Sequence, residues 1–152
     1  MTSTTSERPR AGADLVPHWP LVVFELPPQL STGFVGVLDA SMKRVFARQM
    51  RFVSLVDASK LESLPDANAR RALGEWSKTI DAPTRKYQVA NALVVPSAMA
   101  RGVLTAIHWI HPPPMPTIVC ATVAEGIQFL RGHARDAGLP LGPLDEYART
   151  RR

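Results

Sequence analysis

Two rhythms of apolar residues alternate along this chain. Short apolar runs rich in β-branched residues favour strands, and they occur near residues 21–26, 51–56, 89–95 and 117–120. After each run, apolar residues recur at three- and four-residue spacing, which predicts a helix. The order β-α-β-α-β-α-β-α is typical of an α/β fold, and we expect a single domain with a four-stranded, mainly parallel sheet.

Capping residues set the expected helix boundaries. Ser63 is the predicted cap of the second helix, which should end near Asp81, before Pro83. Ser97 caps the third helix, and Thr122 with Glu125 forms a capping box at the start of the fourth.

The third helix, over about 97–110, has one apolar stripe and one polar face. Met99, Val103, Ile107 and Ile110 form the stripe expected to pack inward. Arg101, Thr105 and His108 then share the outward face, and a stiff proline run follows His111.

The compositional shifts divide the chain into three parts. Residues 18–138 carry the α/β pattern, residues 1–17 are expected to be a disordered tail, and residues 139–152 a flexible basic tail. The first segment lacks the apolar core of a secretory signal, and the longest stretch poor in charge is broken by histidines and prolines. We therefore expect a cytoplasmic, bacterial-type protein.

Composition narrows the chemistry further. The chain has 152 residues, 45% of them hydrophobic and 20% charged, as in ordinary globular domains. Its single cysteine, Cys120, excludes a disulfide framework and any multi-cysteine metal site. A net charge of +5 permits an acidic partner without requiring one.

Several segments resemble one known family. They are the strand end Leu55–Ser59, the helix segment Arg70–Trp76, the turn Val94–Ser97 with Arg101–Ala106, and the terminal strand and helix Thr117–Leu130. Over residues 20–138 the chain resembles the STAS or SpoIIAA-like domains, the anti-sigma-factor-antagonist group. The resemblance implies an α/β fold and a regulatory role through contact with another protein.

One departure bears on how such a domain would be regulated. In the phosphorylated members, an Asp-Ser-Ser-Gly type motif opens the helix after the matching strand, and its serine accepts phosphate. Here that stretch is Asp66–Ala69, which holds no hydroxyl. The serine phospho-switch is therefore not expected, and Ser63 nearby is better explained as a cap.

Polar residues at strand ends and helix starts form a candidate anion or ligand crevice. In open α/β sheets ligands favour the carboxyl ends of the strands, where helix N-termini attract anions. The candidate residues are Asp57, Ser59, Ser97, Arg101 and Thr122. Ordinary capping by the four small polar residues and a solvated Arg101 would explain the same pattern. Asp57 is better explained as the cap of a turn than as an aspartate that accepts phosphate.

Catalytic and metal signatures are missing from the sequence. His108 and His111 lie three residues apart, but no third metal ligand is evident. Cys120 follows apolar residues in a strand, which favours a packed thiol over a nucleophile. We assign no catalytic residue, cofactor or metal. Phe46 and Phe52 are interleaved with the basic residues near the end of the first helix, but Phe46 follows the core stripe, so a solvated basic face is favoured over a nucleic-acid surface.

These observations predict a non-enzymatic regulatory or protein-interaction module. The expected partner is another protein, with a second copy of the chain as one option, and the candidate surface is Arg101, Thr105, His108, His111, Pro113 and Pro114. A small-ligand or lipid-binding domain using the strand-end crevice is the first alternative, and an enzyme is the second.

Overall fold

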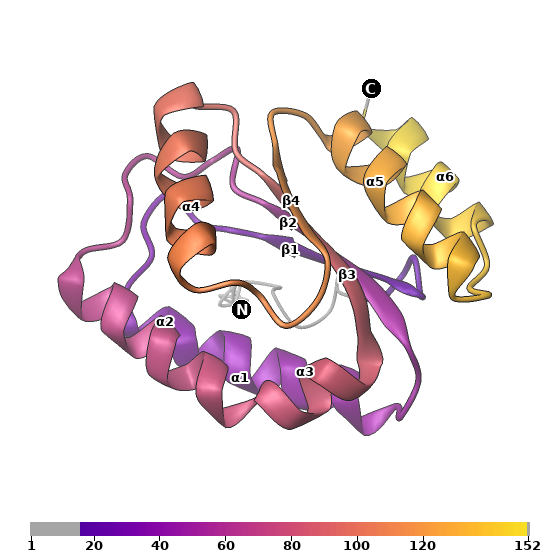
Figure 1. Cartoon of the computed structure of the whole chain (residues 1–152), viewed down its shortest axis with the longest axis horizontal. Helices are drawn as coiled ribbons and strands as arrows, with labels where there is room; N and C mark the ends of the chain where they lie inside the picture. Colours follow the sequence, from indigo (N-terminus) through magenta and orange to yellow (C-terminus); the bar gives the residue numbers. More distant parts are fainter. Residues whose placement is uncertain (1–15, 152) are drawn as a thin grey trace, which may run out of the picture.

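A single parallel sheet forms the centre of the molecule (Figure 1). The computed structural model describes residues 16–151. Its strands are β1 (Leu21–Glu25), β2 (Phe52–Asp57), β3 (Gln88–Val94) and β4 (Thr117–Cys120), and each neighbouring pair is parallel in the order β1-β2-β3-β4. The expected α/β fold with four mainly parallel strands is confirmed.

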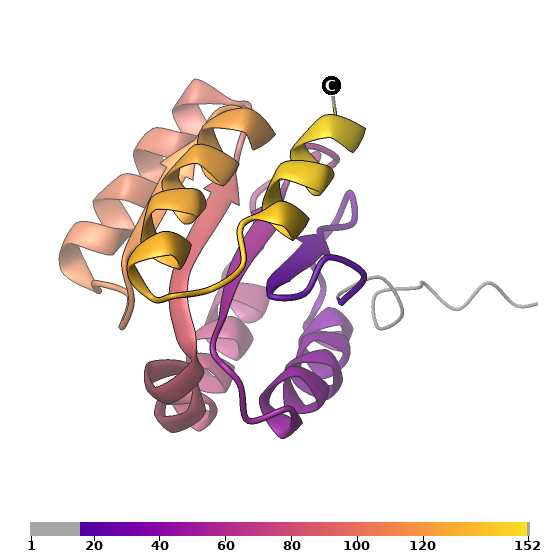
Figure 2. The ribbon, with the colours of Figure 1, turned by 90° about the vertical axis from the view of Figure 1, so that its right-hand side faces the viewer.

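Helices cover both faces of this sheet (Figures 1 and 2). They are α1 (Thr32–Ala47), α2 (Ala67–Thr79), α3 (Asp81–Tyr87), α4 (Ala98–Ile110), α5 (Val123–Asp136) and α6 (Gly142–Thr150). Because spatial order follows sequence order, right-handed crossovers place α1, α2 and α4 on one face. The chain then turns back after β4, and α5 and α6 cover the other face.

Two separate clusters fill the space on the two sides of the sheet. Val22, Phe24 and Phe52 face the α1 side with Leu38 and Met42. On the other side, residues of all four strands pack against α5 and α6, including Leu21, Val53, Leu55, Cys120, Leu130 and Leu144. Strands buried on both faces are nearly continuous in apolar residues, which explains the runs in the sequence.

The start of α2 differs from the expected position. Asp66, and not Ser63, is the cap, and its carboxylate accepts a hydrogen bond from the Ala69 backbone N–H at 2.8 Å. A second short helix, α3, follows after Ile80, with Pro83 in its first turn. Proline is tolerated there because the first-turn N–H groups have no partner within the helix.

The expectation of a flexible tail over residues 139–152 is wrong for the residues that the structure describes. Residues 142–150 form α6, in which Leu144 and Tyr147 are buried with 0% and 4% exposure. Their three-residue spacing and Pro143 near the helix start were the available signals. Of the expected N-terminal tail, residues 1–15 lie outside the described part.

Within residues 16–151, no helix has both the length and the apolar character needed to cross a membrane.

Candidate functional site

The strand-end crevice is occupied by its own side chains. The Asp57 carboxylate accepts hydrogen bonds from the backbone N–H of Ser59, at 2.9 Å, and from the Ser59 hydroxyl. Asp57 therefore closes the turn after β2, as the capping interpretation predicts. Both bonds go to the same oxygen, Oδ1 of Asp57.

The other predicted crevice residues are engaged in the same way. The Ser97 hydroxyl accepts from the Ala100 N–H at 3.3 Å, and the Thr122 hydroxyl accepts from the Glu125 N–H at 3.2 Å. The Glu125 carboxylate accepts from the Thr122 hydroxyl at 3.1 Å and not from the Thr122 backbone N–H, so half of the predicted capping box is formed. The Arg101 guanidinium donates to the carbonyls of Val95 and Pro96 at 2.9 and 2.7 Å. These bonds stabilise the helix starts, as the capping interpretation predicts.

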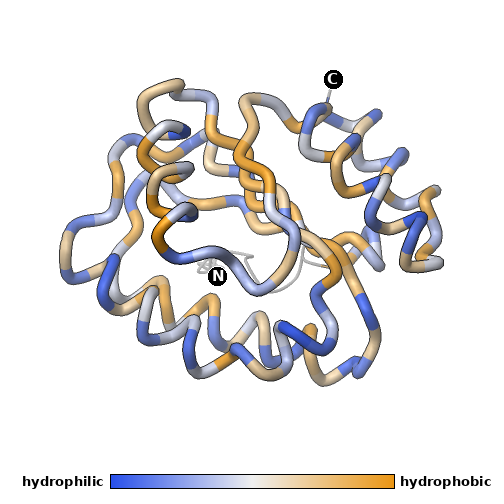
Figure 3. Tube along the Cα trace, viewed as in Figure 1, coloured by the Kyte–Doolittle hydropathy of each residue, from blue (hydrophilic) through white to orange (hydrophobic). Residues whose placement is uncertain are grey.

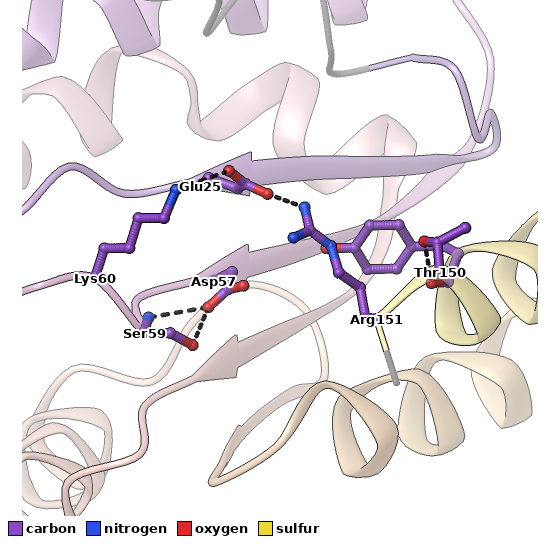
Figure 4. A network of polar contacts seen from close by, with 7 residues as sticks. Glu25, Asp57, Ser59, Lys60, Thr150 and Arg151 are labelled. Atoms are coloured by element: carbon purple, nitrogen blue, oxygen red, sulfur yellow. Dashed lines mark hydrogen bonds and ion pairs between the residues drawn. The ribbon is translucent and has the colours of Figure 1, made fainter.

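The sequence analysis missed an ion-pair network at this end of the sheet (Figure 4). Glu25, at the end of β1, lies between Lys60 and Arg151 and pairs with both. The Arg151 guanidinium also lies 5.4 Å from the centre of the Tyr147 ring. Arg151 directly follows α6, so these contacts hold the C-terminal helix against β1. Glu25 and Arg151 are 126 positions apart in sequence, and no local pattern could reveal that they pair.

Cys120 has the environment of a structural thiol. It is buried, and its Sγ lies 3.5 Å from the Leu93 carbonyl and 3.4 Å from the Thr122 carbonyl. Burial, followed by the negative charge of Glu125, raises the pKa of the thiol. A protonated thiol is a poor nucleophile.

Within residues 16–151, no cluster of three or more His, Cys, Asp and Glu could hold a metal ion.

The orientation of α4 is the reverse of the one expected. Arg101 and His108, expected to face outward, are half-buried, and burial lowers the pKa of the His108 imidazole. The apolar stripe faces solvent instead, and none of the helix's residues is buried. Thr105, His111 and Pro114 of the predicted partner surface are exposed, whereas Pro113 is half-buried.

α4 therefore exposes an apolar face to solvent. Five side chains form it, which we call the α4 face: Met99 (82% exposed), Val103 (41%), Ile107 (41%), Trp109 (84%) and Ile110 (74%). In Figure 3 apolar positions appear on α4 as they do within the sheet. Large apolar side chains gathered in this way mark interaction sites in soluble proteins.

A pocket lies elsewhere, between the sheet and the layer of α1, α2 and α3. It encloses about 310 Å³ and its lining is mostly apolar. Ser54, Gln88 and Asn91 supply polar groups on the sheet side. Sequence reasoning missed these residues because they stand within otherwise apolar strands.

Comparison with known proteins adds no family assignment. No protein-family model matches the chain, no curated protein matches it, and no solved structure matches it.

Proposed function

We propose that this chain is a non-enzymatic protein-interaction module that pairs with a second copy of itself through the α4 face. The observation that carries the proposal is the exposure of this apolar helix face. The resemblance to STAS and SpoIIAA-like domains supports a role in protein contact. The absence of a hydroxyl in Asp66–Ala69 argues for contact without a serine phospho-switch.

The size of the α4 face supports a pairing of this kind. A fully exposed large side chain presents on the order of 150–250 Å², so the five side chains together offer about 600 Å². An ordinary monomer rarely exposes a larger apolar patch than this. Two such faces in contact would bury about 1,200 Å², the lower limit of a stable, specific interface.

Charge does not prevent a second copy from occupying the α4 face. Each chain carries a net charge of +5, so two copies repel each other over most of their surfaces. Arg101 is the one charged residue within Ala98–Ile110, and its guanidinium is turned toward the Val95 and Pro96 carbonyls. Gly102 and Ala106 are exposed beside the stripe and permit a close approach of two helices.

The test measures molar mass by light scattering and sedimentation from about 1 to about 100 µM, a range that covers ordinary self-association. The wild-type chain should form a dimer within this range. Ile110→Glu should abolish it, because a dimer would bury an unpaired carboxylate within each face.

Gln128→Glu is the matched control, since it adds the same charge at an exposed position of α5, on the opposite face of the sheet. It should leave the dimer intact. A wild-type chain that stays monomeric at about 100 µM, or an Ile110→Glu chain that still dimerises, would contradict the proposal.

A further inference from the structure

The pocket between the sheet and α1–α3 has a wall suited to an apolar molecule. Phe24, Val56, Leu73, Trp76, Ile80 and Met115 contribute to its lining. The Trp76 indole is held in place by a hydrogen bond of 3.2 Å from its Nε1 to the Asp39 carboxylate. The volume of about 310 Å³ lies at the lower end of the range for small-molecule sites. Water fills such an apolar space poorly, because few groups can bind it.

A short chain of hydrogen bonds fixes the polar floor of the pocket. The Gln88 Nε2 donates to the Ser54 Oγ at 2.6 Å, and this hydroxyl donates to the Asn91 Oδ1 at 2.8 Å. These bonds use one atom of each amide and leave the Asn91 Nδ2 donor and the Gln88 Oε1 acceptor for another molecule. A ligand hydroxyl can satisfy both, since it donates one hydrogen bond and accepts others.

Thr84 adds a buried hydroxyl that lacks a partner. Its side chain lines the pocket and is 5% exposed, and its Oγ1 forms no hydrogen bond. Thr84 lies one turn before Gln88, whose backbone N–H donates to the Thr84 carbonyl, so it belongs to the same end of the pocket. A buried hydroxyl without a partner is unfavourable, and a ligand that binds it would remove this cost.

The lining offers no free counter-charge to an ionic ligand. Asp81 is the one charged residue among those that line the pocket, and the Arg85 guanidinium pairs with its carboxylate at 2.8 Å. The remaining polar groups are neutral hydroxyls and amides. We infer that this pocket is a binding site for a small, neutral, mainly apolar molecule whose single hydroxyl lies among Thr84, Gln88 and Asn91.

1-Octanol is a suitable probe, with its isomer methyl heptyl ether as the comparison that lacks a hydrogen-bond donor. Binding is followed by ¹H–¹⁵N NMR at the indole N–H of Trp76, which lines the pocket, with Trp109 on the α4 face as an internal control. We expect saturable binding of 1-octanol to the wild-type chain with a Kd of about 0.1–1 mM. The ether should bind about fivefold more weakly, because it cannot donate a hydrogen bond to the side-chain Oε1 of Gln88.

Thr84→Val keeps the shape of the side chain and removes its hydroxyl. Because that hydroxyl has no partner in the free protein, the variant should melt at the same temperature as the wild type or higher. It should also reduce the preference for 1-octanol over the ether. Thr117→Val is the matched control, since the Thr117 hydroxyl donates to the Met115 carbonyl at 3.0 Å, and its removal should lower the melting temperature.

A second pair of variants tests the location. Ser77→Trp places a large side chain at a residue that lines the pocket, and Thr79→Trp makes the same change at an exposed position of α2 outside the lining. Ser77→Trp should abolish binding, and Thr79→Trp should bind as the wild type does.

Two results would overturn the inference. One is the absence of saturable shifts at Trp76 up to the solubility limit of 1-octanol. The other is equal affinity of the wild-type chain for the alcohol and the ether, which would leave an apolar pocket without hydroxyl recognition. Both measurements use the wild-type chain and therefore do not depend on whether a variant folds.

Discussion

Replacing Leu144 with Ala tests whether α6 is an integral part of the domain. Leu144 is completely buried, in the cluster that joins α6 to α5 and the sheet. Truncating a fully buried leucine removes its transfer free energy and leaves a cavity, which together cost about 2–5 kcal/mol. We expect a loss of about 3 kcal/mol in the free energy of unfolding, or a melting temperature lower by about 6–12 °C.

The assay is urea unfolding followed by circular dichroism, with equal m-values required for a valid comparison. Leu64→Ala is the control, because Leu64 is 43% exposed and the same truncation should cost less than about 1 kcal/mol there. A loss below about 1 kcal/mol for Leu144→Ala would refute the reasoning. It would mean that residues 142–150 do not pack on the domain in solution.

Three further predictions concern α5, α4 and the turn after β2. Gly126→Ala should destabilise the fold by about 1–3 kcal/mol, because a Cβ there would lie 3.3 Å from both Ala92 and Leu55 in the core. Gly132→Ala is the comparison: nothing lies within 4 Å of a Cβ at that position, so the change should stabilise the fold by about 0.5–1 kcal/mol in the same unfolding assay. Burial lowers the pKa of His108 from 6.5, so the unfolded state binds the proton more readily than the folded state does. The free energy of unfolding should therefore be highest above pH 6.5 and decrease as the pH falls below it. The decrease between about pH 7.5 and about pH 5 should be smaller in His108→Gln. Asp57→Ala should cost about 1 kcal/mol of unfolding free energy by removing the bond to the Ser59 N–H, whereas Asp57→Asn, which retains an acceptor oxygen, should cost less; equal losses would contradict the capping role.

The strands and several caps were predictable because their signals are local. A run such as Phe52–Val56 is apolar throughout, since both faces of β2 are covered, and this pattern needs no knowledge of the rest of the fold. The same holds for Ser97 and Thr122, whose hydroxyls bind backbone groups three residues away. The error at Ser63 arose because Asp66 is an equally good cap three residues later, and the sequence does not decide between them.

The candidate sites were less predictable because they depend on contacts between distant segments. The crevice residues were placed correctly at helix starts and strand ends, but Arg101 binds carbonyls from the turn before its own helix. The Glu25–Arg151 pair and the pocket floor formed by Ser54, Gln88 and Asn91 join positions far apart in sequence. Such pairings follow from strand order and register, which local patterns do not contain.

The strand order also accounts for the exposure of α4. With the order β1-β2-β3-β4, the crossover helices α1, α2 and α4 must share one face of the sheet. α1 and α2 pack against each other, whereas α4 packs against β4, the strand at one edge of the sheet. Among the described residues no strand lies beyond β4, so α4, which follows β3 and leads into β4, has solvent on its far side. Periodicity identifies an apolar stripe on α4, but the stripe would meet the sheet only if the sheet extended beneath it.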